Sequence, residues 1–221
     1  MSYDLIIISQ SSPELIPITQ QCIDTARLDD CELNIIVVET GQRYEYNVNK
    51  IVMYEGVFNY NRALNLGLRY AKNEVHILAN NDIIFHKGWS KIGELMKLNN
   101  YHSASAWAWH LTMFELGDTI YPGYKVGYIL TGWCLFMDRF CHETIGELDE
   151  SVPFWYSDNI YACQLEAAGI RHGLFANVQI DHIASKTLLK QPSRMQRYYQ
   201  GGAIQIFNQR KRYYAERKRL Q

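Results

Sequence analysis

The chain has 221 residues with a formal net charge of −1, and its 48% hydrophobic content is enough for one large domain with a substantial core. No apolar run approaches the roughly 20 residues that cross a membrane, and the opening MSYDLIIIS lacks the basic start of a signal peptide, so we expect a cytoplasmic protein. Five cysteines without a C-x-x-C pair argue against both a disulfide framework and a zinc site.

Apolar strands and helical segments alternate through the first half of the chain. Strands are expected at residues 3–9, 33–38, 51–54 and 75–82, and helices at 13–28 and 59–71. Asn59 or Asn61 can cap the second helix. This order predicts an α/β fold with a mostly parallel sheet covered by helices. No G-x-G-x-x-G sequence opens the first helix, so the usual dinucleotide fingerprint is absent.

The second half of the chain continues the alternation less regularly. Strands are expected at residues 103–110, 131–137 and 173–180, and helices at 88–98, 139–145 and 157–168. Residues 111–130, rich in Gly and Tyr, are assigned to no element. We expect one domain over residues 1–189 and a basic helical tail over residues 190–221.

The strand that begins at Val75 stops abruptly in Asn80, Asn81 and Asp82. In open α/β sheets, ligands bind at the carboxyl ends of the strands. A carboxylate there can hold a hard divalent cation, and the cation can hold a diphosphate. The same triplet also suits an ordinary turn, because Asn and Asp tolerate left-handed backbone and cap helices.

Six blocks in order resemble the family-2 glycosyltransferases, which have the GT-A fold. The blocks are Val37–Thr40, Asn59–Gly67, Leu78–Asp82, Thr131–Leu135, Ile145–Asp158 and Asp181–His182. The resemblance covers about residues 3–185. It implies an inverting enzyme that transfers a sugar from a nucleotide-diphosphate sugar, by family habit a UDP one, with a divalent metal.

The resemblance also implies roles for individual residues. The implied roles are metal binding (Mn²⁺ or Mg²⁺) for Asp82 and His182, general base for Asp158, nucleotide-sugar binding for Ser9, Glu39, Asn61, Asn65, Asn80 and Asn81, and acceptor binding for Gly132, Trp133, Trp155 and Tyr156. The polar triplet has one carboxylate where the family often has two. Ser157 stands where a Glu usually precedes the base.

Each role has a purely structural alternative. His182 also suits a surface loop, and Glu39 a solvated strand end. Asp158 also suits the N-cap of a helix that starts at Asn159. The three aromatic residues also suit core and rim packing. A non-catalytic binding module and a nucleotidyltransferase are the rival functions, although the latter normally has a Gly-rich loop after the first strand.

The C-terminal segment is strongly basic. Residues 190–221 hold nine Lys and Arg against one Glu, a net charge of +8, which leaves 13 basic and 22 acidic residues, net −9, in the rest. An apolar stripe of Ile204, Phe207, Tyr213 and Tyr214 accompanies the charges. Three interpretations stay open: a helix packed on the acidic body, an amphipathic helix on an anionic membrane, or a nucleic-acid contact in which Tyr side chains such as Tyr198 and Tyr199 stack on bases.

Two classes of acceptor follow from these interpretations. Some bacteriophage enzymes that resemble family-2 glycosyltransferases add sugars to hydroxymethylated pyrimidines in DNA, and a basic tail suits that task. The host cytoplasm would then be the compartment. A capsule, a lipopolysaccharide or another glycan is the alternative acceptor. The sequence does not indicate an oligomeric state.

Overall fold

The computed structural model describes residues 1–183 and 200–220. The strands are β1 (Ser2–Ser9), β2 (Glu32–Glu39), β3 (Lys50–Met53), β4 (Val75–Asn80), β5 (Ile83–Phe85), β6 (Ser103–Trp107), β7 (Ile120–Pro122), β8 (Cys134–Asp138) and β9 (His172–His182). The helices are α1 (Ile16–Ala26), α2 (Tyr60–Leu68), α3 (Lys91–Leu98), α4 (Arg139–Ile145), α5 (Ser157–Ala167) and α8 (Ala203–Arg219).

The strands form one mixed sheet in the order β3-β2-β1-β4-β8-β6-β9-β5, and β7 also pairs with β9. The first four strands of this order are parallel to one another. Because β8 is antiparallel to both β4 and β6, β6 and its parallel neighbour β9 run in the direction of β4. Only β5, β7 and β8 run against the other strands in the described residues. The predicted mostly parallel α/β sheet is confirmed.

Helices cover both faces of the sheet because apolar side chains occupy alternate positions on each side of the central strands. Leu5 and Ile7 of β1 belong to the apolar cluster that includes α1 and α3. Ile6 and Ile8 belong to the cluster that includes α2, α4 and α5. The central strands are buried on both faces, as is usual for parallel strands in α/β folds.

Several boundaries differ from the predicted ones for local reasons. α1 begins at Ile16 rather than at residue 13, so that Pro17 falls in the first turn, where a missing N–H is tolerated. Asn59, not Asn61, caps α2, and its side chain accepts from the N–H of Arg62. β5 and β7, of three residues each, are too short for a period-2 pattern to stand out in the sequence.

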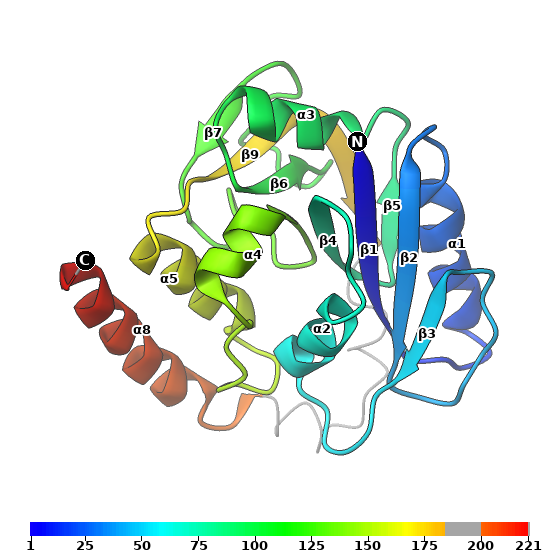
Figure 1. The fold of residues 1–221 in the computed structure, drawn as a ribbon, viewed down its shortest axis with the longest axis horizontal. Helices are drawn as coiled ribbons and strands as arrows, with labels where there is room; N and C mark the ends of the chain where they lie inside the picture. Colours follow the sequence, from blue (N-terminus) through cyan, green and yellow to red (C-terminus); the bar gives the residue numbers. More distant parts are fainter. Residues whose placement is uncertain (184–199, 221) are drawn as a thin grey trace.

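α8 lies at the outer edge of the molecule, beside α5 (Figure 1). The predicted helix is confirmed, but the predicted apolar stripe is partly wrong, since Ile204 is 49% exposed. Ala203, Ile206, Phe207 and Tyr214 make the contact instead, as a period of 3.6 residues from Ala203 requires. The tail residues Lys190, Arg194, Arg197, Tyr198 and Tyr199 lie outside the described residues.

No helix in the described parts of the chain, residues 1–183 and 200–220, has an apolar stretch long enough to span a bilayer.

Candidate functional site

Asp82 and His182 meet beyond the carboxyl end of β4, at the carboxyl end of β9. The chain turns after β4 and enters β5, whose first residue, Ile83, pairs with His182 of β9. His182 Nε2 lies 3.1 Å from Asp82 Oδ1, and their side chains are only 14% and 4% exposed. A carboxylate oxygen and an imidazole nitrogen at this separation suit a divalent transition metal such as Mn²⁺.

Among the described residues, Asp82 and His182 are the two side chains of the His, Cys, Asp or Glu type that meet here. Among residues 1–183 and 200–220, no group of three or more His, Cys, Asp or Glu side chains is arranged to hold a metal ion. A cation bound by Asp82 and His182 would leave coordination positions open for other ligands, such as the oxygens of a substrate or of water. An open coordination sphere of this kind is typical of a metal that contacts substrate.

Aromatic rings orient the imidazole of His182. The Trp133 ring stacks on it, with centroids 5.5 Å apart and planes 11° from parallel. The ring of His110 meets Trp133 edge-on at 5.9 Å. Burial lowers the pKa of His110, and the nearby His182 lowers it further. Sequence reasoning did not predict His110, because it lies in a turn with no motif around it.

A second Asp–His pair supports the same end of β9. His86 Nε2 lies 2.7 Å from Asp181 Oδ2, and the N–H of Trp109 is 3.3 Å from Asp181 Oδ1. Asp181 thereby ties the end of β5 and the turn after β6 to the residue that precedes His182. These contacts fix the backbone next to His182 and so help to position its imidazole.

Asp158 lies in the first turn of α5, against Gly132. The helix begins at Ser157 and Tyr156 occupies the N-cap position, so the alternative in which Asp158 is the N-cap is wrong. Asp158 Oδ1 accepts from the N–H of Asn159 at 2.8 Å. A Cβ added at Gly132 would be 2.7 Å from Asp158 Oδ2, so the approach requires glycine. Burial raises the pKa of Asp158 above its usual value, although backbone N–H groups act against it.

Tyr60 joins the two halves of the site. Its hydroxyl lies 2.9 Å from Asn80 Oδ1 and 3.3 Å from the carbonyl of Gly132, and the N–H of Asn80 donates to the carbonyl of Trp133. Burial raises the pKa of Tyr60, and the charge of Asp158 adds to the effect. The structure thus connects the Asp82–His182 pair to Asp158 through Trp133 and Gly132. Sequence reasoning assigned no role to Tyr60, although this residue lies within the block Asn59–Gly67.

Glu39 is fully buried at the end of β2. Its Oε1 accepts from the N–H groups of Ser11 and Gly41, both at 2.8 Å. Its Oε2 is buried and has no hydrogen-bond partner in the described parts of the chain. The solvated strand end is therefore wrong for Glu39. An unpaired buried acceptor is costly unless a ligand satisfies it, so Glu39 fits the predicted contact to a nucleoside.

The other residues predicted to bind the nucleotide sugar make hydrogen bonds within the protein. Ser9 Oγ lies 3.2 Å from Thr19 Oγ1, and Asn81 Nδ2 donates to the same hydroxyl at 2.9 Å. Asn61 and Asn65 donate to the carbonyls of Asp149 and Leu148. These bonds give all four side chains a structural role, and their binding of a nucleotide sugar stays a prediction.

The two aromatic residues before α5 have different surroundings. Trp155 is partly exposed and meets Phe154 edge-on at 5.6 Å. The ring of Tyr156 stacks on Phe207 of α8, with centroids 5.2 Å apart. Acceptor binding stays a prediction for both, and the structure adds a packing role for Tyr156.

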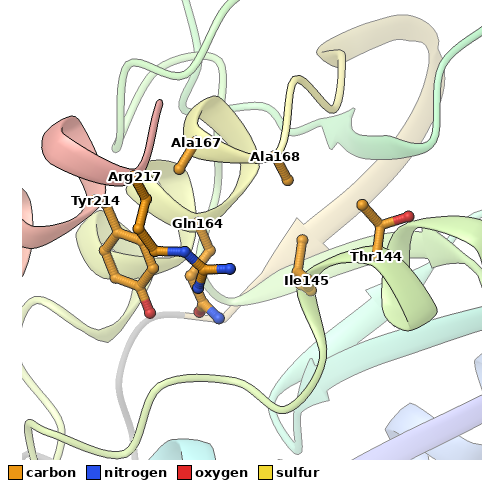
Figure 2. Close-up of a pocket in the computed structure, with 7 residues that line it drawn as sticks. All are labelled: Thr144, Ile145, Gln164, Ala167, Ala168, Tyr214 and Arg217. Atoms are coloured by element: carbon orange, nitrogen blue, oxygen red, sulfur yellow. The ribbon is translucent and has the colours of Figure 1, made fainter. Parts of the chain in front are cut away.

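A hollow of about 200 Å³ lies elsewhere, among α4, α5 and α8 (Figure 2). Its lining residues are Thr144, Ile145, Gln164, Ala167, Ala168, Tyr214 and Arg217. In Figure 2 the guanidinium of Arg217 lies beside the side chains of Gln164 and Tyr214. The hollow contains none of the predicted site residues and is separate from the site around Asp82.

Sequence comparisons give no match, either to a protein-family model or to a curated protein. Solved structures do match. S. aureus TarS residues 1–349 superimposes with a TM-score of 0.63 at 10% identity, over 82% of this chain and 60% of that one. The mannosyltransferase PcManGT from Pyrobaculum calidifontis, in complex with GDP-Man and Mn²⁺, gives 0.65 at 14% identity, over 83% and 57%.

A third match is GalNAc-T7 with UDP, GalNAc and Mn²⁺, with a TM-score of 0.63 at 10% identity, over 82% of this chain and 43% of that one. The chain thus spans between 43% and 60% of the length of these three structures. Their likeness confirms the GT-A fold that the sequence predicts.

Proposed function

We propose that the protein is an inverting, metal-assisted glycosyltransferase of the family-2 type that uses a nucleotide-diphosphate sugar, with UDP as the favoured nucleotide. The observation that carries this proposal is the connection of the Asp82–His182 pair to Asp158 through Trp133 and Gly132. The two similar structures that contain Mn²⁺ with GDP-Man or with UDP support the same chemistry.

Asp82 and His182 would hold a divalent cation, and such a cation would supply positive charge to balance a leaving diphosphate. Asp158 takes the proton of the acceptor hydroxyl as its oxygen attacks the anomeric carbon of the sugar. The bond between that carbon and the diphosphate breaks, and the nucleoside diphosphate leaves. Burial favours Asp158 as the base, because a raised pKa makes the carboxylate a better proton acceptor. The unpaired Oε2 of Glu39 accepts from a ribose hydroxyl or a base N–H.

For the acceptor we propose hydroxymethylated pyrimidine in phage DNA, which would put the reaction in the host cytoplasm. The support is the exposed positive charge of α8, whose side chains Lys211, Arg212, Arg217, Lys218 and Arg219 all face solvent. A glycan hydroxyl, as in a capsule or a lipopolysaccharide, is the alternative acceptor for the same base. A non-catalytic module would have no use for a half-buried carboxylate against Gly132, next to the Trp133 ring that stacks on His182.

Three substitutions test the assignment. Asp82→Ala should abolish Mn²⁺-dependent binding of UDP or GDP, and His182→Ala should weaken it less, because Asp82 and the diphosphate oxygens still hold the metal. Asp158→Asn should leave nucleotide binding within about twofold of wild type while lowering turnover by about 100-fold or more, the usual scale for loss of a general base. Calorimetry with MnCl₂ measures binding, and release of nucleotide from UDP- and GDP-sugars measures turnover.

The pH profile gives a further check. Turnover should fall as the pH drops through the pKa of Asp158, because only the ionised carboxylate accepts a proton, and this fall should occur above the pH expected for an ordinary Asp. Asp24→Asn, an exposed carboxylate of α1, is the matched control and should match wild type. Full activity in Asp158→Asn, or Mn²⁺-dependent nucleotide binding in Asp82→Ala, would contradict the mechanism.

A further inference from the structure

The base proposed above, Asp158, lies two residues after a ten-residue segment, 147–156, which we call the approach segment. We infer that α8 braces the approach segment and so positions Asp158 for catalysis. The inference rests on the proposed function only where it treats Asp158 as the base. The brace itself is a matter of contacts, and three groups of contacts support it.

The first group holds Asp149, a buried carboxylate in the approach segment. Its Oδ2 lies 2.5 Å from Arg210 Nε and accepts from the Tyr214 hydroxyl at 2.9 Å, and both side chains belong to α8. Its Oδ1 accepts from the N–H of Ser151. Burial opposes the charge, but the bonds from Ser151, Tyr214 and Arg210 together hold the pKa of Asp149 below its usual value. The ionised carboxylate is thus a fixed attachment point for α8.

The second group holds the opposite side of the approach segment. Three asparagines of the cap and first turns of α2 donate to its backbone: Asn65 to Leu148, Asn61 to Asp149, and Asn59 to Glu150 and Val152, at 2.7 to 3.1 Å. The N–H of Tyr60 donates to the carbonyl of Pro153 at 2.8 Å. The approach segment is therefore held between α2, which carries the site residue Tyr60, and α8.

The third group acts at the last residue before α5. Tyr156 has φ of +70°, a left-handed conformation that non-glycine residues adopt only where the surroundings hold them. Its ring stacks on Phe207 of α8 with planes 11° from parallel. The backbone at Tyr156 sets the direction in which α5 starts, and Asp158 stands two residues later against Gly132. Phe207 therefore supports the turn that aims the base.

Apolar contacts make the brace continuous. Val152 and Ile160, on either side of the turn, belong to one cluster with Ala203 and Tyr214 of α8. A helix that merely covered α5 would need only such apolar contacts. The ion pair of Arg210 with the buried Asp149 and the ring stack at Tyr156 add directional constraints on the approach segment, and these fix position more narrowly than apolar packing does.

The test compares variants of the full-length chain. Phe207→Ala removes the stacked ring, and Arg210→Met with Tyr214→Phe removes both α8 donors to Asp149. Phe207→Tyr keeps the ring and should restore wild-type behaviour. Arg212→Gln is the matched control, because Arg212 is exposed on the same helix and belongs to none of the three contact groups.

Two readouts are measured. Amide hydrogen exchange of residues 149–160 should rise by about tenfold in the brace variants, while β1, β2 and β4 stay protected, because local opening leaves the rest of the fold intact. With UDP-GalNAc, UDP-glucose or GDP-mannose as donor, kcat should fall by about tenfold while the Kd for UDP or GDP with MnCl₂ stays within about twofold.

Each outcome separates the brace from the proposed function. Unchanged exchange at residues 149–160, or exchange that rises equally throughout the fold, would overturn the brace. So would raised local exchange with unchanged kcat. A wild-type protein that turns over none of the donors would contradict the proposed function, while hydrogen exchange would still decide whether α8 braces the approach segment.

Discussion

Two carboxylates, the buried Asp4 and the half-buried Asp158, show how surroundings assign a role to a single residue. Asp4 accepts from Asn34 Nδ2 and from the backbone N–H groups of Lys72 and Asn73, and it also pairs with His76. Despite the cost of burial, the bonds from His76, Asn34 and the backbone lower its pKa. Asp158 has few donors, and burial raises its pKa. A carboxylate with many donors holds structure, whereas one with few is suited to take a proton.

Asp4→Asn should lower the free energy of unfolding at pH 7 by about 3 kcal/mol, because its buried donors lose a charged acceptor. A lowered folded-state pKa means that the charge stabilises the fold above an unfolded pKa of about 3.9, and that this contribution is lost as the pH falls through the folded value. The difference between wild type and Asp4→Asn should therefore shrink as the pH falls below about 4.

Urea unfolding between pH 7 and pH 3 measures this difference. Asp24→Asn removes an exposed carboxylate and should stay within about 0.5 kcal/mol of wild type at every pH. A gap between wild type and Asp4→Asn that does not change with pH would show that Asp4 does not stabilise the fold through its charge.

At the scale of elements, α2 connects the sheet to the site. It carries Tyr60 at its first position, and Asn61 and Asn65 hold the approach segment. The helix lies very close to β1, since a Cβ added at Gly67 would be 2.4 Å from Ile6 Cγ2 and 3.0 Å from Val38 Cγ2. Both neighbours are buried side chains in the core. The position of α2, and of the groups that it carries, depends on this close approach.

Gly67→Ala should destabilise the protein by about 2 kcal/mol, because the added methyl group overpacks the contact between α2 and β1. Helix propensity alone predicts the opposite, a gain of about 1 kcal/mol. Thermal and urea unfolding decide between the two. Gly117→Ala, where a Cβ would meet nothing within 4 Å, is the control. A Gly67→Ala protein more stable than wild type would mean that α2 moves easily on the sheet.

At the scale of the whole molecule, part of the positive charge of the basic tail is neutralised by the acidic body within the fold. Arg210 is held by buried Asp149, so this cation stabilises the fold and is not available to a polyanion. The cations that face solvent on α8 begin at Lys211. The interpretation as a helix packed on the body is confirmed for residues 203–219, and the exposed charge leaves nucleic-acid binding as a proposal.

Replacing Lys211, Arg212 and Lys218 by Gln should weaken binding to duplex DNA of any sequence. The plot of the logarithm of the binding constant against the logarithm of the salt concentration should become less steep by about three units if each of the three side chains contacts one phosphate. The reason is that each such contact releases about one counterion. Arg210 is left intact to preserve the brace. Gel shifts between about 50 and 200 mM salt measure the slope.

The matched control carries the same charge change at Lys87, Lys91 and Lys97, all exposed on or near α3. It should bind DNA like wild type. Binding of the wild-type protein to anionic vesicles but not to DNA would favour a membrane acceptor. No salt-sensitive DNA binding at all would end the proposal of a DNA substrate.

The sequence by itself determined the features that depend on neighbours along the chain. Apolar periodicity identified most strands and helices, and the cap at Asn59 was one of two predicted choices. The ordered blocks predicted the GT-A fold. These features are local because a residue's burial on one face of a strand or helix depends chiefly on its spacing from the next apolar residues.

Only the tertiary structure decided which distant side chains meet. The family resemblance assigned Asp82 and His182 to one metal site, but no local pattern around either residue places them together, because the short strand β5 must first pair with β9. Likewise, no local pattern places Asp158 against Gly132 or Arg210 on Asp149. These contacts depend on long-range packing, in which each element takes the position where its apolar face is buried, and polar side chains then bond to whichever groups that packing brings within reach.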